Sequence, residues 1–429
     1  MLFKDITIID ENYETRKNMY VGTSGDIIAY ISDVMPEESY GEVYSGKGKV
    51  LLPAFVNSHS HAAMTLMRGY GENMSLDDWL FSRVFPFEEK LNSEAVYWGT
   101  ALSMAESIRF GIVSSTDMYY FCEDVVRAVL DAGAKANVSR SISHFTDDDL
   151  YDSYRFRETE SLYRNFNGAG EGKIIIDMSI HSEYTTTPRA VKQLADFTKE
   201  IGANMHVHVS ETKKEHEECK ERHGGLTPVQ YLNSLGAFDT PSVAAHCVWI
   251  EGEDYDILKE KGVTVAVNPV SNLKLASGVC NVSALLDRGI NVAIGTDSVA
   301  SNNSLNFIEE MKMFAISTKG TIYDPAVVSP VQTLAAATAG GARAQGRNDC
   351  GFIRVGNKAD LIVLDIDTPY MRPSHNLITN IVYSASGSDI VMTMCDGRVL
   401  YKDGEYLTID IERTYYETEK NTEAILSQL

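Results

Sequence analysis

Two histidines separated by one residue, His59 and His61, follow the apolar run Val50 to Val56. If the run is a strand, side chains two residues apart point the same way, so both imidazoles lie on one side where it ends. That arrangement suits two ligands of one divalent cation. The alternative is a polar turn with two surface histidines. The motif alone does not exclude it, because short motifs often match by chance.

Further apolar runs end in side chains that bind metals or titrate, and these are His181, His208 followed by Glu211, His246 and Asp297. Five of the ten histidines therefore stand at strand ends, which chance scatter over 429 residues would rarely produce. Imidazoles and carboxylates are side chains that can hold one divalent cation and leave room for water. Such a cation lowers the pKa of the water from about 15.7 toward roughly 7–9.

The elements that must position these side chains alternate in type between residues 53 and 345. Helix-length amphipathic segments separate eight short apolar strands, at 50–56, 112–117, 135–141, 173–180, 204–209, 242–247, 263–267 and 290–296. Eight β/α units predict an α/β fold with a parallel (β/α)8 barrel, in which the chemistry lies at the carboxyl ends of the strands.

The two ends of the chain have a different sequence pattern, with short alternating apolar runs and glycine-containing turns such as Asp396-Gly397. This pattern predicts small antiparallel β structure, and the two ends are expected to pair into one β-sandwich domain. The expected divisions are residues 1–52 and 346–410 for that domain and 53–345 for the metal-dependent barrel. Residues 411–429 are expected to form a C-terminal helical tail.

Composition narrows the class of partner. Sixty acidic against thirty-eight basic residues give a net charge of −22, which opposes binding to nucleic acids and anionic membranes. No apolar run reaches the roughly 18 residues of a membrane span, and the first residues lack the pattern of a signal peptide. The six cysteines form no CxxC pair. We therefore expect a cytoplasmic protein with a small-molecule substrate. The sequence is compatible with a homo-oligomer and does not decide the oligomeric state.

The motifs PAFVNSHSH, HVSET, AAHC and GTDSVASNN occur in this order, and as a set they are specific. They resemble the amidohydrolase superfamily, in its mononuclear-metal deaminase and chlorohydrolase branch, over essentially the whole chain. The resemblance implies metal ligation by His59, His61, His208 and Asp297. It also implies catalytic roles for Asp297 as proton acceptor, for Glu211 as proton carrier and for His246 beside the reacting water.

The resemblance also bears on the number of metal ions. Binuclear members of the superfamily bridge two metals with a modified lysine at the end of strand four. Here that strand ends in His181 and offers no lysine, so one divalent ion is expected. Zn²⁺ is expected first, with Fe²⁺, Ni²⁺ or Mn²⁺ as alternatives.

Substrate choice must come from the loops that follow the strands. Residues 79–88 are similar to the corresponding loop of 5-methylthioadenosine/S-adenosylhomocysteine deaminases, which implies that Trp79 flanks the purine or thioether and that Glu88 accepts the ribose hydroxyls. A packed aromatic cluster with a surface glutamate is the alternative. By the same resemblance His181 approaches the ribose or base.

Arginines are expected to bind the carboxylate of homocysteine, since their planar fork suits a carboxylate. Arg140, at the end of strand three, matches the first arginine of the family. Arg155 and Arg157 both qualify as the second. One departure is Ala54, where relatives usually carry glycine, and it does not threaten the ligands.

The expected function is hydrolytic deamination of adenosine derivatives to their inosine analogues with release of ammonia. The derivatives are 5-methylthioadenosine and S-adenosylhomocysteine, with adenosine or 5′-deoxyadenosine as further substrates. The first alternative is the same chemistry on another amino-substituted ring, such as guanine or an s-triazine. A second is a non-catalytic relative that kept the barrel as a scaffold, which the retained ligand set and Glu211 argue against.

Structural roles compete with these functional ones at several positions. Glu211 taken alone is also compatible with a helix N-cap or a surface carboxylate. His206 is expected to pack or hydrogen-bond near the barrel interior. We expect surface, loop or solvated-helix positions for the other histidines, which are His144, His216, His223 and His375.

Overall fold

The computed structural model describes residues 1–429, apart from the side chain of Asp77. Its centre is a ring of parallel strands in two hydrogen-bonded groups. The first group is β6 (Phe55–Ser60), β7 (Ile112–Tyr119), β8 (Lys135–Arg140) and β9 (Ile174–Ile176). The second is β10 (Met178–Ile180), β11 (Met205–Val209), β12 (Ser242–His246), β13 (Thr264–Val267) and β14 (Val292–Ile294).

These strands form the predicted (β/α)8 barrel. β9 and β10 are two parts of one strand interrupted at Asp177, which leaves eight strands. A parallel bridge between Ser60 and Asp297 joins the end of the first strand to the residues after the last, so the ring is closed. Because all eight strands run the same way, their carboxyl ends meet at one mouth.

The first barrel strand begins later than the sequence predicted. The run at residues 50–56 is divided between β5 (Lys49–Pro53) of an outer sheet and β6 of the barrel. The N–H of Ala54 donates to Asp360 O, and that of Phe55 donates to Gly111 O, so the chain changes sheet at this point. Both sheets bury the run, and hydrophobicity alone therefore showed no boundary. Pro53 was the available signal, since proline donates no ladder hydrogen bond.

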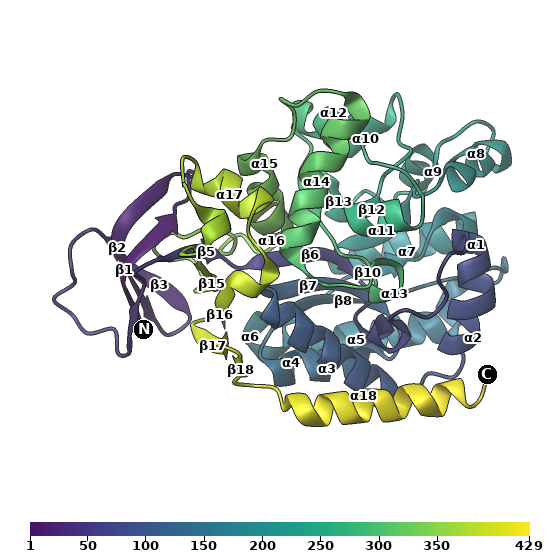
Figure 1. Ribbon diagram of the computed structural model, residues 1–429. Coiled ribbons are helices and arrows are strands. Elements are labelled where there is room, and N and C mark those ends of the chain that lie inside the picture. The colour runs from purple at the N-terminus through teal and green to yellow at the C-terminus, as the bar shows by residue number, and fades with distance from the viewer.

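The chain ends form the second β region, as predicted, and Figure 1 shows it to the left of the barrel. Its nine strands are hydrogen-bonded in the order β18-β17-β16-β15-β5-β1-β2-β3, with β4 beside β1. C-terminal β15 pairs antiparallel with β5, whereas β1 runs parallel to β4 and β5, so the sheet is mixed rather than purely antiparallel. The bounds are β1 Leu2–Ile9, β2 Thr15–Ser24, β3 Ile27–Ser32, β4 Val43–Ser45, β15 Leu361–Asp365, β16 Ile390–Cys395, β17 Arg398–Lys402 and β18 Glu405–Tyr406.

This sheet has a hydrophobic cluster of its own, in which Phe3, Ile8 and Leu51 from the N-terminal part meet Val363 and Met392 from the C-terminal part. Neither end of the chain can bury these side chains without the other. The sheet therefore stabilises the entry to β6, which continues directly from β5.

Helices cover the barrel (Figure 1). α3 (Ser93–Arg109) begins at the N-cap Asn92 and ends before Gly111, whose φ of 79° favours glycine. The others are α1 Leu76–Trp79, α2 Phe85–Glu88, α4 Cys122–Ala132, α5 Tyr154–Phe166, α6 Ala169–Gly172, α7 Pro188–Ile201, α8 Lys213–Arg222, α9 Pro228–Ser234, α10 Asp254–Glu260, α11 Pro269–Lys274, α12 Val282–Asp287, α13 Val299–Asn302, α14 Phe307–Ile322, α15 Pro330–Ala335, α16 Gly341–Ala344, α17 Leu377–Tyr383 and α18 Ile411–Leu426.

The tail helix α18 lies along the outside of the barrel beside α3 (Figure 1). The hydroxyl of Thr418 on α18 donates to the carbonyl of Trp98 on α3 at 3.2 Å. Within the described part of the chain, no helix has both the length and the apolar character needed to span a membrane.

Candidate metal centre and active site

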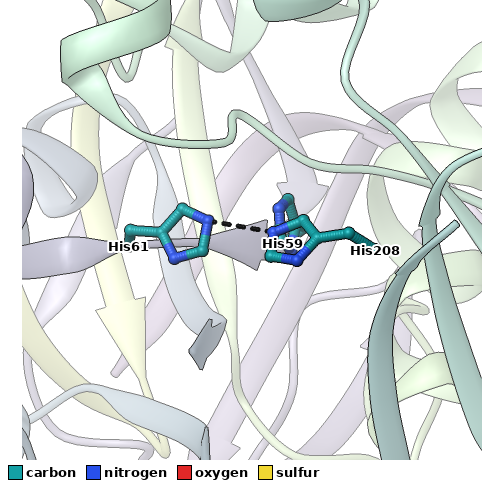
Figure 2. A group of neighbouring side chains, drawn as sticks. All are labelled: His59, His61 and His208. Carbon is teal, nitrogen blue, oxygen red and sulfur yellow. Dashed lines mark hydrogen bonds between the residues drawn. The ribbon is translucent and has the colours of Figure 1, made fainter. Parts of the chain in front are cut away.

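His61 and His208 meet at the mouth of the barrel, and their rings make the same kind of hydrogen bond to the backbone. Nδ1 of His61 lies 2.6 Å from Met118 O, and Nδ1 of His208 lies 2.6 Å from His181 O. A carbonyl only accepts, so each Nδ1 carries the proton and each Nε2 is left as a lone pair. The two Nε2 atoms face one another at 3.3 Å (Figure 2). When both rings are neutral, two lone pairs at that distance repel, and either a proton on His61 or a metal cation between the rings removes the repulsion.

His59 completes the group of imidazoles. Its Nδ1 lies 2.9 Å from Nε2 of His206, which is therefore buried beside the ligands as expected. Its Nε2 is buried and has no hydrogen-bond partner among the described residues. Oδ1 of Asp297 is 3.6 Å from this atom and 3.3 Å from Nε2 of His61. A buried imidazole nitrogen beside a carboxylate oxygen fits the donor set of a divalent cation.

Asp297 is held by one oxygen and presents the other. Its Oδ2 accepts from the hydroxyls of Ser271 at 2.6 Å and Ser301 at 3.0 Å. Its Oδ1 accepts from the N–H of Ser298 and faces the imidazoles. The backbone is in the left-handed region at φ 59°, which costs energy for a non-glycine residue and is common at functional sites. The carboxylate thereby presents one oxygen to the imidazoles.

The electrostatics of the group favour positive charge at its centre. Burial lowers the pKa of His59 to about 3 and that of His208 well below its usual value. Burial also acts to lower the pKa of His61, but the Asp297 carboxylate and the Met118 carbonyl outweigh it and raise that pKa to about 9. Burial acts to raise the pKa of Asp297, yet the neighbouring imidazoles hold it well below the usual range. The donor set is thus three imidazoles around an ionised carboxylate.

His246 and Glu211 lie next to this group. Nδ1 of His246 is 2.8 Å from Oδ1 of Asn272, and its Nε2 is 3.8 Å from Oε2 of Glu211. Glu211 is buried, and burial raises its pKa above the usual value. The N-cap of α8 is Thr212, whose capping-box partner is Glu215, so Glu211 is neither the cap nor a surface carboxylate. It is a buried carboxyl group that faces the cavity.

A small inner pocket of about 70 Å³ collects most of the predicted residues. His61, His208, Glu211, His246 and Asp297 line one part of it. The remaining wall includes the predicted substrate residues Trp79, Glu88 and His181, together with Tyr119. Burial raises the pKa of Glu88 to about 7. The structure therefore brings an aromatic wall and a carboxyl group to the same pocket as the imidazoles.

The predicted arginines lie in an adjoining outer chamber of about 760 Å³. Arg140 is buried at the end of β8, and Arg155 and Arg157 enter from α5. Arg140 and Arg155 both lie near Tyr120, whereas Arg157 donates to Asp152 O at 2.6 Å. The two chambers share Phe85, Glu88, Tyr120 and Ser141. The inner pocket therefore adjoins the chamber that Arg140 and Arg155 line.

Several expectations need correction. Residues 79–88 are helical, not a loop, since α1, a π-turn at Leu80–Val84 and α2 follow one another. His144 is buried, with Nε2 3.2 Å from Asp148, because it lies beside Thr186 in a parallel bridge. His216 is buried as well, because it is on the inner face of α8, where Nδ1 lies 3.2 Å from Oγ of Ser210.

Ser271, Asn272 and Tyr119 belong to the site although no sequence motif indicated them. Ser271 and Asn272 follow β13, and they hold Asp297 and His246. Their one signal was position, since they come directly after strand seven. Serine hydroxyls and asparagine amides do not titrate near neutral pH, and so they do not stand out as candidates. Ser301 belongs to the GTDSVASNN motif, and its hydroxyl also holds Asp297.

Comparison with known proteins agrees with this geometry. Residues 50–400 match the Amidohydrolase family. The chain is 40% identical over 428 residues to the 5-methylthioadenosine/S-adenosylhomocysteine deaminase of Caldanaerobacter subterraneus subsp. tengcongensis, covering 99% of this chain and 98% of that one. It is 37% identical over 396 residues to the 5′-deoxyadenosine deaminase of Methanosarcina mazei, covering 92% and 91%.

Among solved structures, an adenosine deaminase from Xanthomonas campestris with bound zinc superposes with a TM-score of 0.93 at 27% identity, covering 99% of this chain and 98% of that one. The family match spans most of the chain, and the curated relatives are similar over nearly their full length. The chain therefore belongs to the amidohydrolase family.

Proposed function

We propose that the protein is a metal-dependent hydrolytic deaminase that converts adenosine derivatives to their inosine analogues and releases ammonia. 5-Methylthioadenosine and S-adenosylhomocysteine are the proposed substrates, with 5′-deoxyadenosine and adenosine next to them. The observation that carries the proposal is the inner pocket. Histidine side chains and Asp297 line one part of it, and Glu88 and Trp79 line the same pocket. Relatives that share 36–40% of their residues with this chain carry the first of these activities in their names.

His59, His61, His208 and Asp297 would hold one divalent cation, with Zn²⁺ the first choice. Imidazole nitrogens and a single carboxylate oxygen are ligands that zinc prefers. The Nε2 atom of His59 has no hydrogen-bond partner among the described residues, so its lone pair is available to the cation. When bound, the cation supplies Lewis-acid chemistry that makes a water molecule acidic near neutral pH. The backbone carbonyls at Nδ1 of His61 and His208 keep those rings in the tautomer that ligation needs.

The remaining chemistry belongs to the protein side chains. Asp297 accepts a proton from the attacking water, because its Oδ1 faces the site and Oδ2 is held by serines. Glu211 donates a proton to the ring nitrogen next to the attacked carbon, which draws electrons away from that carbon. His246 hydrogen-bonds the oxygen that develops there, with its ring fixed by Asn272. The proton held by Asp297 then passes to the amino group, which leaves as ammonia, while the remaining hydroxyl proton returns to Glu211 as the carbonyl of the inosine analogue forms.

Recognition of the nucleoside rests on two chambers. Trp79 covers the purine or the thioether, and Glu88 accepts hydrogen bonds from the ribose hydroxyls in the inner pocket. Arg140 and Arg155 face the outer chamber, where they meet the carboxylate of the homocysteine tail. The second candidate function is deamination of bare rings such as guanine and triazines. These rings lack a ribose and a tail, so they offer no group that Glu88 or the arginines could bind.

We further propose that the barrel, residues 53–345, acts as the catalytic domain. The β domain of residues 1–52 and 346–410 holds the first barrel strand in place, because β5 leads into β6. Residues 411–429 form the tail along the barrel.

The direct test is ammonia release by the metal-loaded protein on a panel of ring amines. We expect 5-methylthioadenosine and S-adenosylhomocysteine to be turned over with a higher kcat/KM than guanine or an s-triazine, and the absorbance change to match inosine analogues. Dialysis against a chelator should remove the activity, and zinc should restore it. A higher kcat/KM for guanine would overturn the substrate assignment.

Replacing Glu88 with alanine should lower kcat/KM for 5-methylthioadenosine about 10- to 150-fold, mostly through KM. The change removes hydrogen bonds from the two ribose hydroxyls to a charged acceptor, worth roughly 1.5–3 kcal/mol. Steady-state kinetics on the nucleoside and on free adenine measure the effect. Glu89→Ala is the matched control, because the neighbouring side chain is exposed. An equal loss on adenine would contradict ribose recognition by Glu88.

A further inference from the structure

The outer chamber is lined by a glutamate, Glu158, whose negative charge has no role in binding the carboxylate of a substrate. A 5′ substituent that leaves the nucleoside past Glu88 enters this chamber, since Glu88 and Tyr120 line both spaces. Glu158 on α5 lines the chamber together with Arg140 and Arg155. A role for Glu158 in binding this substituent rests on the proposed function, because the substituent belongs to the same substrate.

Arg140 and Glu158 form an ion pair across the chamber wall, with Nε of Arg140 2.9 Å from Oε2 of Glu158. The arginine side chain is 8% exposed and the glutamate side chain 55% exposed. The guanidinium also lies over the ring of Tyr120 at 4.7 Å and donates to Ser141 O. The cation is therefore fixed by its surroundings, and the anion is open to the solvent of the chamber.

Helix geometry places a second cation beside this anion. Arg155 and Glu158 are three residues apart on α5, so they are neighbours on one face of the helix. The guanidinium of Arg155 lies over the ring of Tyr154 at 4.7 Å. Arg140 and Arg155 thus both lie next to Glu158, while the other charged side chains that line the chamber are Arg157, Glu88, Glu89, Glu123 and Asp124. A purely anionic tail would meet repulsion from Glu158.

An α-amino acid group carries a carboxylate and an ammonium on the same carbon, and this pair complements the chamber wall. We propose that Glu158 is a specificity residue that binds the α-ammonium of the homocysteine tail, while the tail carboxylate lies against Arg140 and Arg155. The site selects a zwitterion over a simple acid of the same length. A carboxylate that already accepts from Arg140 retains lone pairs for an ammonium donor.

The test compares S-adenosylhomocysteine with its desamino analogue, in which hydrogen replaces the α-ammonium. Glu158→Gln should lower the ratio of their kcat/KM values about 3- to 10-fold, the size expected for a charged contact that water partly screens. The ratio is the proper readout, because release of Arg140 from Glu158 helps the carboxylate of both substrates equally. 5-Methylthioadenosine, which lacks the tail, should change less than about twofold.

Glu160→Gln is the matched control, since Glu160 is on the same helix and pairs with Arg164 instead. A thermal melt of each variant checks the fold. An unchanged ratio for Glu158→Gln overturns the ammonium site, and so does a rise in activity on S-adenosylhomocysteine without a change in the ratio, which would mean that Glu158 only competes for Arg140. Wild-type protein inactive on all three nucleosides would instead overturn the proposed function itself.

Discussion

Asp297→Asn should lower kcat/KM for 5-methylthioadenosine by at least about 10⁴-fold, the largest loss expected from any single change in this chain. The asparagine amide keeps the shape of the side chain and its contacts with Ser271 and Ser301. It has no negative charge to offer a cation and no lone pair basic enough to take the proton of the attacking water. Steady-state ammonia release and the metal content per chain measure the two losses separately.

Asp287→Asn serves as the control, because the same substitution then falls on an exposed residue of α12. That variant should keep both the metal and the rate. If Asp297→Asn carried its metal and retained a near-normal rate, the carboxylate would be neither ligand nor base, and the proposed division of roles would fail.

The second large effect is expected from Glu211→Gln, with kcat lowered about 10²- to 10⁴-fold, the usual range for a general acid–base group. Glutamine can still hydrogen-bond a ring nitrogen and can replace the contact with Ser277. It cannot deliver a proton. The variant should keep its metal, since the four proposed ligand residues are unchanged.

Metal analysis and ammonia release on the same preparation test this pair of expectations. Glu217→Gln, on the exposed face of α8, controls for the lost charge. A Glu211→Gln protein with full activity would show that the buried carboxyl group has a structural role. A variant that lost its metal together with its activity would move Glu211 from proton transfer to the support of the ligands.

The barrel and the convergence of the proposed ligand residues at its mouth were predictable because strand ends in a parallel ring converge. His59, His208 and Asp297 are far apart in sequence, yet each ends or follows an apolar run, and the fold alone brings them together. The boundary at Ala54 was not predictable from hydrophobicity, because both sheets bury the run. A β-strand pattern records which faces are covered and not which sheet covers them.

The supporting residues were harder to predict, for a different reason. Ser271 and Asn272 act through a hydroxyl and an amide, which occur throughout any sequence without a distinguishing pattern. Only the three-dimensional distance to Asp297 and His246 separates them from ordinary loop residues. The ion pair between Arg140 and Glu158 is similar, since residues 18 positions apart meet only when α5 packs beside the end of β8.

The pairing of β5 with β15 has a consequence for the order in which the protein is made. β5 is synthesised early, but one of its neighbours, residues 361–365, emerges from the ribosome only near the end of translation. Until then β5 has an open edge, the kind of surface that pairs with other chains. Because β6 continues from β5 and carries His59, the strand that holds this proposed ligand lacks its full support until residues 361–365 pair with β5.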